Sequence, residues 1–159
     1  MTERIYSEQF VIDAGSIDML GHVNNREYVR WMEHIATAHA ASLGWTYERL
    51  QSIGRIWVVR EHWVEYLRPA FLGESLEILT WVQGWHGPAC MRRYAVKRGA
   101  DLIMVGATEW IFVDFERKRP ALLMPEIYNS FPVVPSNDPE LAVLGIARPV
   151  RYAPPASLC

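Results

Sequence analysis

The sequence has no apolar run near the roughly 18 residues needed to span a bilayer. Its first ten residues lack the apolar core of a signal peptide. It has only two cysteines, Cys90 and Cys159, and neither lies in a Cys-x-x-Cys or Cys/His spacing that would bind zinc. These absences argue against a disulfide scaffold, a zinc site and a membrane partner, and they favour a reducing, cytoplasmic setting.

Neither sign of charge dominates. The chain has 16 basic and 18 acidic residues, a net charge of −2, which gives no global signal for binding nucleic acid. It also has no Gly-x-Gly-x-x-Gly motif, and helices do not alternate with strands, so a dinucleotide-binding parallel sheet is excluded.

What the chain does contain is enough apolar material for one domain. Half of its 159 residues are hydrophobic, and Trp, Tyr and Phe number 7, 7 and 5. So many large rings suit either a crowded core or a broad contact surface, and composition alone does not choose between the two.

One long amphipathic helix is predicted over residues 25–43, where apolar residues recur at i, i+3, i+4 and i+7. Asn24 is a suitable N-cap, Glu27 occupies the capping-box position three residues later, and Gly44 can end the helix.

The other predicted elements are mostly strands. Alternating and β-branched segments predict them over residues 4–13, 55–66, 74–85, 89–98 and 102–115. A strand, a long helix and then four strands is an α+β pattern with an antiparallel sheet. Eight of the ten prolines fall in the last forty residues, where Pro125 and Pro139 can each begin a short helix, and the end of the chain, from Arg148, looks like a peripheral tail.

The densest polar segment lies between the first strand and the long helix, from Asp18 to Tyr28. A helix N-terminus presents unpaired N–H groups that can hold an oxyanion, and a carboxylate beside it can activate water or attack an activated carbonyl. The alternative is that Asp18 and Asn24 only cap their own loop and that His22 is an ordinary loop residue.

The segment Asp18-x-x-Gly21-His22-Val23-Asn24-Asn25-x-x-Tyr28 resembles the signature of hotdog-fold acyl-CoA thioesterases of the 4-hydroxybenzoyl-CoA thioesterase type. Its His-Val-Asn-Asn core is also similar to the catalytic segment of acyl-ACP thioesterases. Tyr66-Leu-Arg-Pro69 and the segment from Asp114 to Pro125 support the resemblance, which covers about residues 6–128.

The resemblance implies a hotdog fold, a long helix wrapped by a five-stranded antiparallel sheet, with active sites at the subunit interface of a homodimer or homotetramer. It places Asp18 at the catalytic carboxylate and the backbone amide of Asn25 at the thioester carbonyl. His22 and Asn24 would orient Asp18 or water, and Tyr28 would line the acyl pocket or the core. No metal or cofactor is implied apart from the coenzyme A of the substrate.

Two further groups are candidate binding residues. Trp57, Val58 and Val59 correspond to the region that lines the acyl pocket in the family, although an ordinary core strand explains each of them as well. A basic cluster could hold the phosphates of CoA or an acidic carrier protein, or could simply be a solvated strand edge. Its candidate CoA-binding residues are Arg92, Arg93, Lys97 and Arg98.

The sequence therefore predicts a hotdog domain over residues 1–128 with a Pro-rich C-terminal extension, residues 129–159, that is not a separate domain. The predicted function is hydrolysis of acyl-CoA thioesters. Two alternatives stay open: an acyl-ACP thioesterase, and an acyl-binding hotdog protein without hydrolytic activity. Acyl length, carrier and subunit number are not specified by the sequence.

Overall fold

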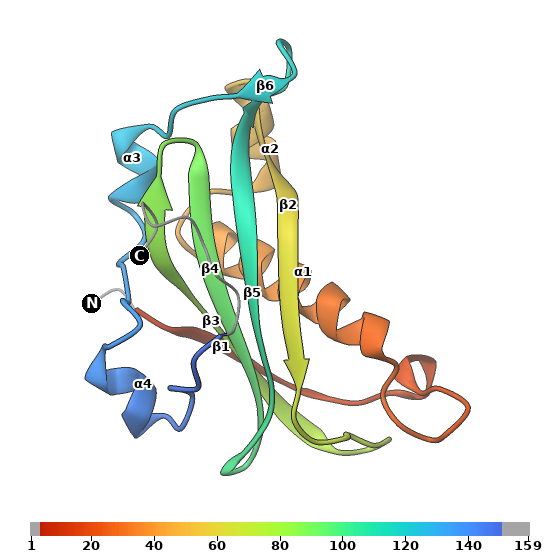
Figure 1. Ribbon diagram of the computed structural model, residues 1–159. Helices are drawn as coiled ribbons and strands as arrows, with labels where there is room; N and C mark the ends of the chain where they lie inside the picture. Colours follow the sequence, from red (N-terminus) through yellow and green to blue (C-terminus); the bar gives the residue numbers. More distant parts are fainter. Residues whose placement is uncertain (1–3, 151–159) are drawn as a thin grey trace.

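A computed structural model describes residues 4–150 of the chain. A single long helix lies on one side of a curved antiparallel sheet, and short helices lie at its ends and on its other side (Figure 1). The elements in chain order are β1 (Tyr6–Val11), the 3-10 turn η1 (Ala14–Ser16), α1 (Asn25–Ser42), α2 (Tyr47–Ser52), β2 (Arg55–Tyr66), β3 (Ser75–His86), β4 (Ala89–Arg98), β5 (Asp101–Asp114), β6 (Arg119–Pro120), α3 (Pro125–Tyr128) and α4 (Pro139–Val143).

Helix α1 begins and ends where the sequence indicates. The Asn24 side chain accepts a hydrogen bond from the Arg26 N–H, and Gly44 has a φ of 87°, the left-handed conformation that ends a helix. The predicted capping-box role of Glu27 is wrong. Its side chain does not accept from the Asn24 N–H, because that N–H donates to the Ser16 carbonyl, and Glu27 pairs with Arg30 instead.

The sheet has the strand order β1-β3-β4-β5-β2, with every pair antiparallel. The two-residue β6 pairs with β5 as a sixth strand, beyond the five predicted. Bulges between Val59 and Glu61 and between Val82 and Gly84 curl the sheet around α1. This is the hotdog arrangement, so the predicted fold class is confirmed.

The inner face of the sheet is covered by α1. Met32 and Ile35 of the helix are fully buried against sheet residues such as Tyr94. Gly106 on β5 lets the helix approach closely, because a Cβ there would lie 3.1 Å from the Met32 sulfur and 3.2 Å from the Trp63 carbonyl oxygen.

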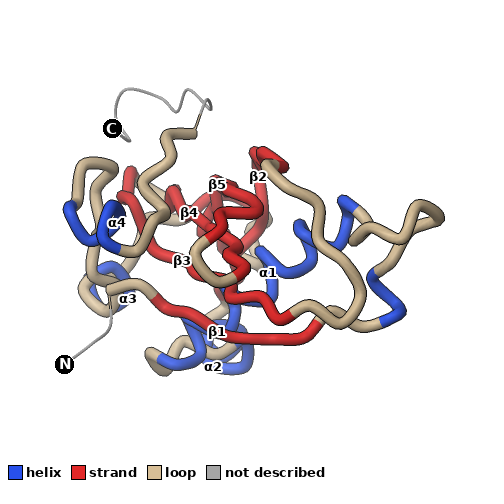
Figure 2. Tube along the Cα trace, turned by 90° about the horizontal axis from the view of Figure 1, so that it is seen from below, coloured by secondary structure: helices blue, strands red, loops and turns tan. Residues whose placement is uncertain are grey.

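The outer face of the central strands is covered by the segment that follows α3. Val134, Leu141 and Ile146 are buried against Trp81 and its neighbours Leu79, Ala95 and Val105. Figure 2 shows α4 and α1 on opposite sides of the strands. The predicted peripheral tail is anchored at its start, since Arg148 forms an ion pair with Glu65 and Val150 packs against Met91 and Ala107. Residues 151–159 lie outside the described residues.

The two edges of the sheet are β1 and β2. Strand β2 has twelve residues, and within residues 4–150 its one strand partner is β5, so it forms a long edge of the sheet. Among residues 4–150, no helix is long and apolar enough to cross a membrane.

Helix α4 provides a direct test of the outer core. We expect Leu141→Ala to lower the free energy of unfolding by about 2–5 kcal/mol, because it leaves a cavity between α4 and the sheet. The matched control is Val143→Ala in the same helix, at an 84% exposed side chain, which we expect to change stability by less than about 0.5 kcal/mol. Urea denaturation measures both; equal small effects would mean that α4 does not contribute to the core.

Candidate active site

The loop that contains Asp18 is organised by the Asp18 side chain itself. Its Oδ1 accepts hydrogen bonds from the backbone N–H of Leu20 at 2.8 Å and of His22 at 3.1 Å. The backbone bridges Ile17 to Val23 on either side of the turn. One carboxylate oxygen therefore fixes the loop, and Oδ2 has no hydrogen-bond partner among the residues that the structure describes. The loop-capping interpretation of Asp18 is therefore correct for Oδ1.

The N-terminus of α1 follows directly. The amides of Arg26 and Glu27 are both capped by Asn24, through its side chain at 3.1 Å and its carbonyl at 2.9 Å. Asn25, the first helical residue, has no acceptor for its N–H within the described part of the chain, as expected for the first turn of a helix. Its carbonyl accepts a hydrogen bond from the Tyr66 hydroxyl at 3.2 Å, which ties the helix start to the end of β2.

Two other residues of the motif, His22 and Tyr28, have side chains that pack against neighbouring rings. The His22 ring lies edge-on to Phe71, with 5.1 Å between ring centroids, and it is the His22 amide that reaches Asp18. Tyr28 is buried between Trp31 and Tyr66, and burial raises the pKa of its hydroxyl to about 12. At neutral pH Tyr28 is a neutral, packed ring.

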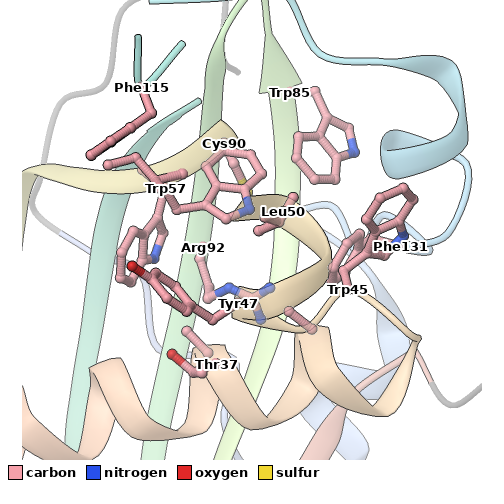
Figure 3. Close-up of a pocket in the computed structure, with 14 residues that line it drawn as sticks. Thr37, Trp45, Tyr47, Leu50, Trp57, Trp85, Cys90, Arg92, Phe115 and Phe131 are labelled. Atoms are coloured by element: carbon pink, nitrogen blue, oxygen red, sulfur yellow. The ribbon is translucent and has the colours of Figure 1, made fainter. Parts of the chain in front are cut away.

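A partly open hollow lies near the C-terminal end of α1. It has a volume of about 220 Å³ and is lined by α1, α2 and strands β2 to β5, with Phe131 from the segment after α3 (Figure 3). Half of its lining residues are aromatic, including four of the seven tryptophans: Trp45, Trp57, Trp85 and Trp110. Part of the aromatic excess noted in the sequence therefore forms the walls of a pocket.

The predicted acyl-pocket residues divide between two hollows. Trp57 lines the aromatic pocket and packs on Phe112, with 4.9 Å between ring centroids. Val58 and Val59 line a second, more open hollow beside β6, which Arg60 and Lys118 also border.

The predicted CoA-binding cluster is not brought together within the chain. Arg92 and Arg93 lie on opposite faces of β4 and are both buried, with exposed fractions of 4% and 3%. Arg93 faces the C-terminal segment, donates to the Arg148 and Gly106 carbonyls, and has its pKa lowered to about 10 by burial. Lys97 donates to the Leu144 carbonyl.

The fourth residue, Arg98, lies at the end of β4. It binds the Pro69 carbonyl and Glu74, near the loop that follows β2. Lys97 and Arg98 are partly exposed, and they are therefore the members of the cluster that can still reach a ligand.

Arg92 points into the aromatic pocket (Figure 3). Its Nη1 donates to His39 Nδ1 at 2.9 Å and to the Thr80 hydroxyl at 3.1 Å. His39 also stacks on Tyr6, with 5.2 Å between ring centroids. Burial, with a contribution from the positive charge of Arg92, lowers the pKa of His39 to about 3.

Sequence reasoning missed this Arg92–His39 pair. Alternation along β4 indicates that Arg92 and Arg93 face opposite sides, but not which of them faces the helix. His39 lies on the apolar stripe of the helix and gives no separate signal of its contact with β4.

Comparison with known proteins agrees with this fold. The family model described as "Acyl-ACP thioesterase N-terminal domain" matches residues 3–131. "Putative acyl-CoA thioesterase YneP" of Bacillus subtilis is 29% identical over 117 residues, which cover 73% of this chain and 85% of that protein.

Two solved structures illustrate the structural likeness. DHNA-CoA thioesterase from Staphylococcus aureus superimposes with a TM-score of 0.74 at 21% identity, covering 89% of this chain and 95% of the other. An acyl-ACP thioesterase from Bacteroides thetaiotaomicron gives a TM-score of 0.77 at 19% identity, covering 96% of this chain and 58% of the other.

The hotdog sheet around one helix, together with the thioesterase family match over residues 3–131, defines the class as hotdog-fold thioesterases. Because the matched region spans most of the sequence, the chain belongs to the acyl-ACP thioesterase N-terminal domain family. The predicted resemblance and the predicted thioesterase function are both confirmed.

The buried imidazole of His39 predicts a specific pH dependence of stability. The folded pKa of about 3 lies below the ordinary value of 6.5, so below that value the unfolded chain binds a proton that the folded chain does not. Stability is therefore complete above pH 6.5 and is lost as the pH falls. His39 should remove about 2 kcal/mol of unfolding free energy between pH 7 and pH 5.

His39→Asn is the matched variant, because its amide oxygen keeps an acceptor for Arg92 and does not titrate. Urea unfolding at the two pH values should show a smaller pH-dependent loss in His39→Asn than in the wild type. Equal losses in the two proteins would show that His39 does not carry the effect.

Proposed function

We propose that the protein hydrolyses acyl-CoA thioesters, with Asp18 as the catalytic carboxylate and the backbone amide of Asn25 as the oxyanion donor. The proposal rests on the different environments of the two Asp18 carboxylate oxygens. Oδ1 accepts hydrogen bonds from two backbone amides, while Oδ2 has no hydrogen-bond partner among the described residues. This carboxylate lies on the short loop that leads to the uncapped first amide of α1.

Such an arrangement suits a thioester, whose carbonyl is electrophilic and whose thiolate leaves readily. Asp18 removes a proton from water as the water oxygen attacks the carbonyl carbon, and the Asn25 N–H stabilises the resulting oxyanion. Collapse of this intermediate expels the CoA thiolate, which takes up the proton. Direct attack by Asp18, giving an anhydride that water then cleaves, is the second route open to the same carboxylate.

Neither route requires a metal or a cofactor, so we propose that CoA enters only as part of the substrate. Asn24 supports the site by capping α1, and His22 supports it by donating its amide to Asp18. For the CoA phosphates we retain Lys97 and Arg98, the partly exposed members of the predicted basic cluster.

We further propose that the active protein is a homodimer or a homotetramer in which each site is shared by two chains. Thr37 lines the aromatic pocket twelve residues after Asn25, about 18 Å along the helix axis, so Asp18 and the pocket of one chain lie far apart. The long edge strand β2, whose one strand partner within residues 4–150 is β5, offers an antiparallel twofold contact that would bring the Asp18 loop of one chain toward the pocket of the other. Met19 and Leu20, 101% and 78% exposed beside Asp18, are apolar surface that a partner chain would cover.

A reducing cytoplasmic location also remains a prediction from the sequence. The alternative to an acyl-CoA substrate is an acyl-ACP substrate, which the name of the matched family favours.

Asp18→Asn tests the mechanism cleanly, because the Asn side chain keeps an Oδ1 acceptor for the Leu20 and His22 amides. We expect kcat to fall by about 100-fold or more, with folding and oligomeric state unchanged. The matched control is Asp13→Asn, at another carboxylate that accepts a backbone amide two residues later, which should stay within about twofold of the wild type. Undiminished thioester hydrolysis by Asp18→Asn would contradict the assignment.

The carrier is tested by one acyl chain presented on CoA and on acyl-carrier protein. With thiol release as the readout, we expect the higher kcat/KM for the CoA thioester. A higher value for the carrier-protein thioester would favour the acyl-ACP alternative, and saturable binding of acyl-CoA without thiol release would indicate a non-hydrolytic binding protein.

A further inference from the structure

The aromatic pocket contains one buried positive charge. Arg92 is 4% exposed and is the single charged residue among the described residues that line the pocket. Within residues 4–150, no carboxylate forms an ion pair with it. An isolated buried charge is strongly unfavourable, so an unpaired guanidinium in an apolar pocket indicates that a counter-ion is supplied from outside the chain.

The hydrogen bonds of Arg92 leave a defined part of its guanidinium unpaired. Both of its hydrogen bonds to described residues, to His39 Nδ1 and to the Thr80 hydroxyl, use Nη1. Nε and Nη2 have no partner among the described residues, and together they form the edge of a guanidinium that binds a carboxylate through two parallel hydrogen bonds.

The neighbours of Arg92 hold it in place without neutralising it. His39 accepts at Nδ1 and is therefore an uncharged imidazole, and Thr80 contributes a hydroxyl. Phe131 adds a ring whose centroid lies 5.6 Å from the guanidinium carbon. The edge that would bind a carboxylate is thus fixed before any ligand arrives.

We propose that the aromatic pocket binds a short acyl chain that ends in a carboxylate, and that Arg92 is the specificity-determining residue that pairs with this carboxylate. The proposal rests on the proposed thioesterase function and names its substrate class, the mono-thioesters of short dicarboxylic acids. It also gives Arg92 a role at the acyl end of the substrate, in place of the predicted role at the CoA phosphates.

The dimensions and walls of the pocket support this class. A volume of about 220 Å³ is smaller than the roughly 300 Å³ at which drug-sized ligand pockets begin, so the acyl group is short. The rings of Trp57, Trp85 and Trp110 pack against methylene groups and exclude water, which strengthens the carboxylate–guanidinium pair. A neutral acyl chain of equal length would leave the Arg92 charge buried and unpaired.

The first experiment compares glutaryl-CoA with pentanoyl-CoA, two substrates of equal chain length that differ in the terminal carboxylate. We expect the wild type to favour glutaryl-CoA by about 100-fold in kcat/KM, since a site built to pair with a polar group rejects the analogue that lacks it. An equal or greater kcat/KM for pentanoyl-CoA overturns the proposal without any variant being needed.

The second experiment asks whether Arg92 carries the preference. Arg92→Gln should lower the glutaryl-to-pentanoyl ratio of kcat/KM to about one or below. Arg92→Lys should restore part of this ratio, because lysine keeps the positive charge but cannot form the two parallel hydrogen bonds of a guanidinium. Arg68→Gln, at an exposed arginine paired with Asp101, is the control and should keep the wild-type ratio. A wild-type ratio in folded Arg92→Gln also overturns the proposal.

A binding measurement separates this proposal from the thioesterase function. Monomethyl glutarate carries one carboxylate and dimethyl glutarate carries none, and either would be detected by the fluorescence of the pocket tryptophans. We expect saturable binding of the monomethyl ester alone. If the protein hydrolyses no acyl-CoA yet binds the monomethyl ester selectively, the proposed function fails and the pocket assignment stands; equal binding or no binding of the two esters overturns the pocket assignment.

Discussion

Strand β4 lies at the centre of the sheet, and it must be covered on both faces. Eight consecutive residues of this strand, from Ala89 to Val96, are buried, which is unusual for an antiparallel strand. Helix α1 covers one face, and the segment after α3 covers the other. Because both faces are covered, Arg92 and Arg93 are both buried, on opposite sides of the strand.

The consequence is clearest at Arg92 and Arg93, which are adjacent in sequence and lie in different environments. Arg93 meets backbone carbonyls of β5 and of the C-terminal segment, so its donors are largely used within the chain. Arg92 meets a neutral imidazole and a hydroxyl through one nitrogen, which leaves an unpaired edge facing a hydrophobic pocket. The first arrangement stabilises a fold, whereas the second is suited to a ligand.

Local signals predicted the fold well because they act within a few residues. The Asn24 cap, the apolar stripe of the helix and the turn residues between strands place α1 and all five predicted strands to within two residues of their observed bounds. The role of Glu27 was wrong because a tertiary hydrogen bond from the Asn24 amide to Ser16 takes the group that a capping box needs. The Asp18 loop could be proposed as the candidate site from the sequence because its polar residues are contiguous.

The pocket could not be predicted in the same way, because its walls come from segments far apart in the chain. Trp45, Trp85 and Phe131 come from three separate segments of the chain that the fold brings together, and Phe131 lies in the Pro-rich region that the sequence assigned to an extension. The face of the sheet on which the Arg92 side chain lies depends on the register of β4 against β3, where Thr80 is opposite Tyr94. Sequence patterns specify alternation but not this register.

The central claim is that an active site combines the Asp18 loop of one chain with the aromatic pocket of another. It is tested most directly by mixing two inactive variants, Asp18→Asn and Ala40→Phe, in which the added ring fills the pocket. If sites are shared, random mixing gives dimers in which one site contains both intact parts, and activity recovers to about one quarter of the wild-type rate. No recovery above the rates of the separate variants, in mixtures shown to exchange subunits, would contradict the account.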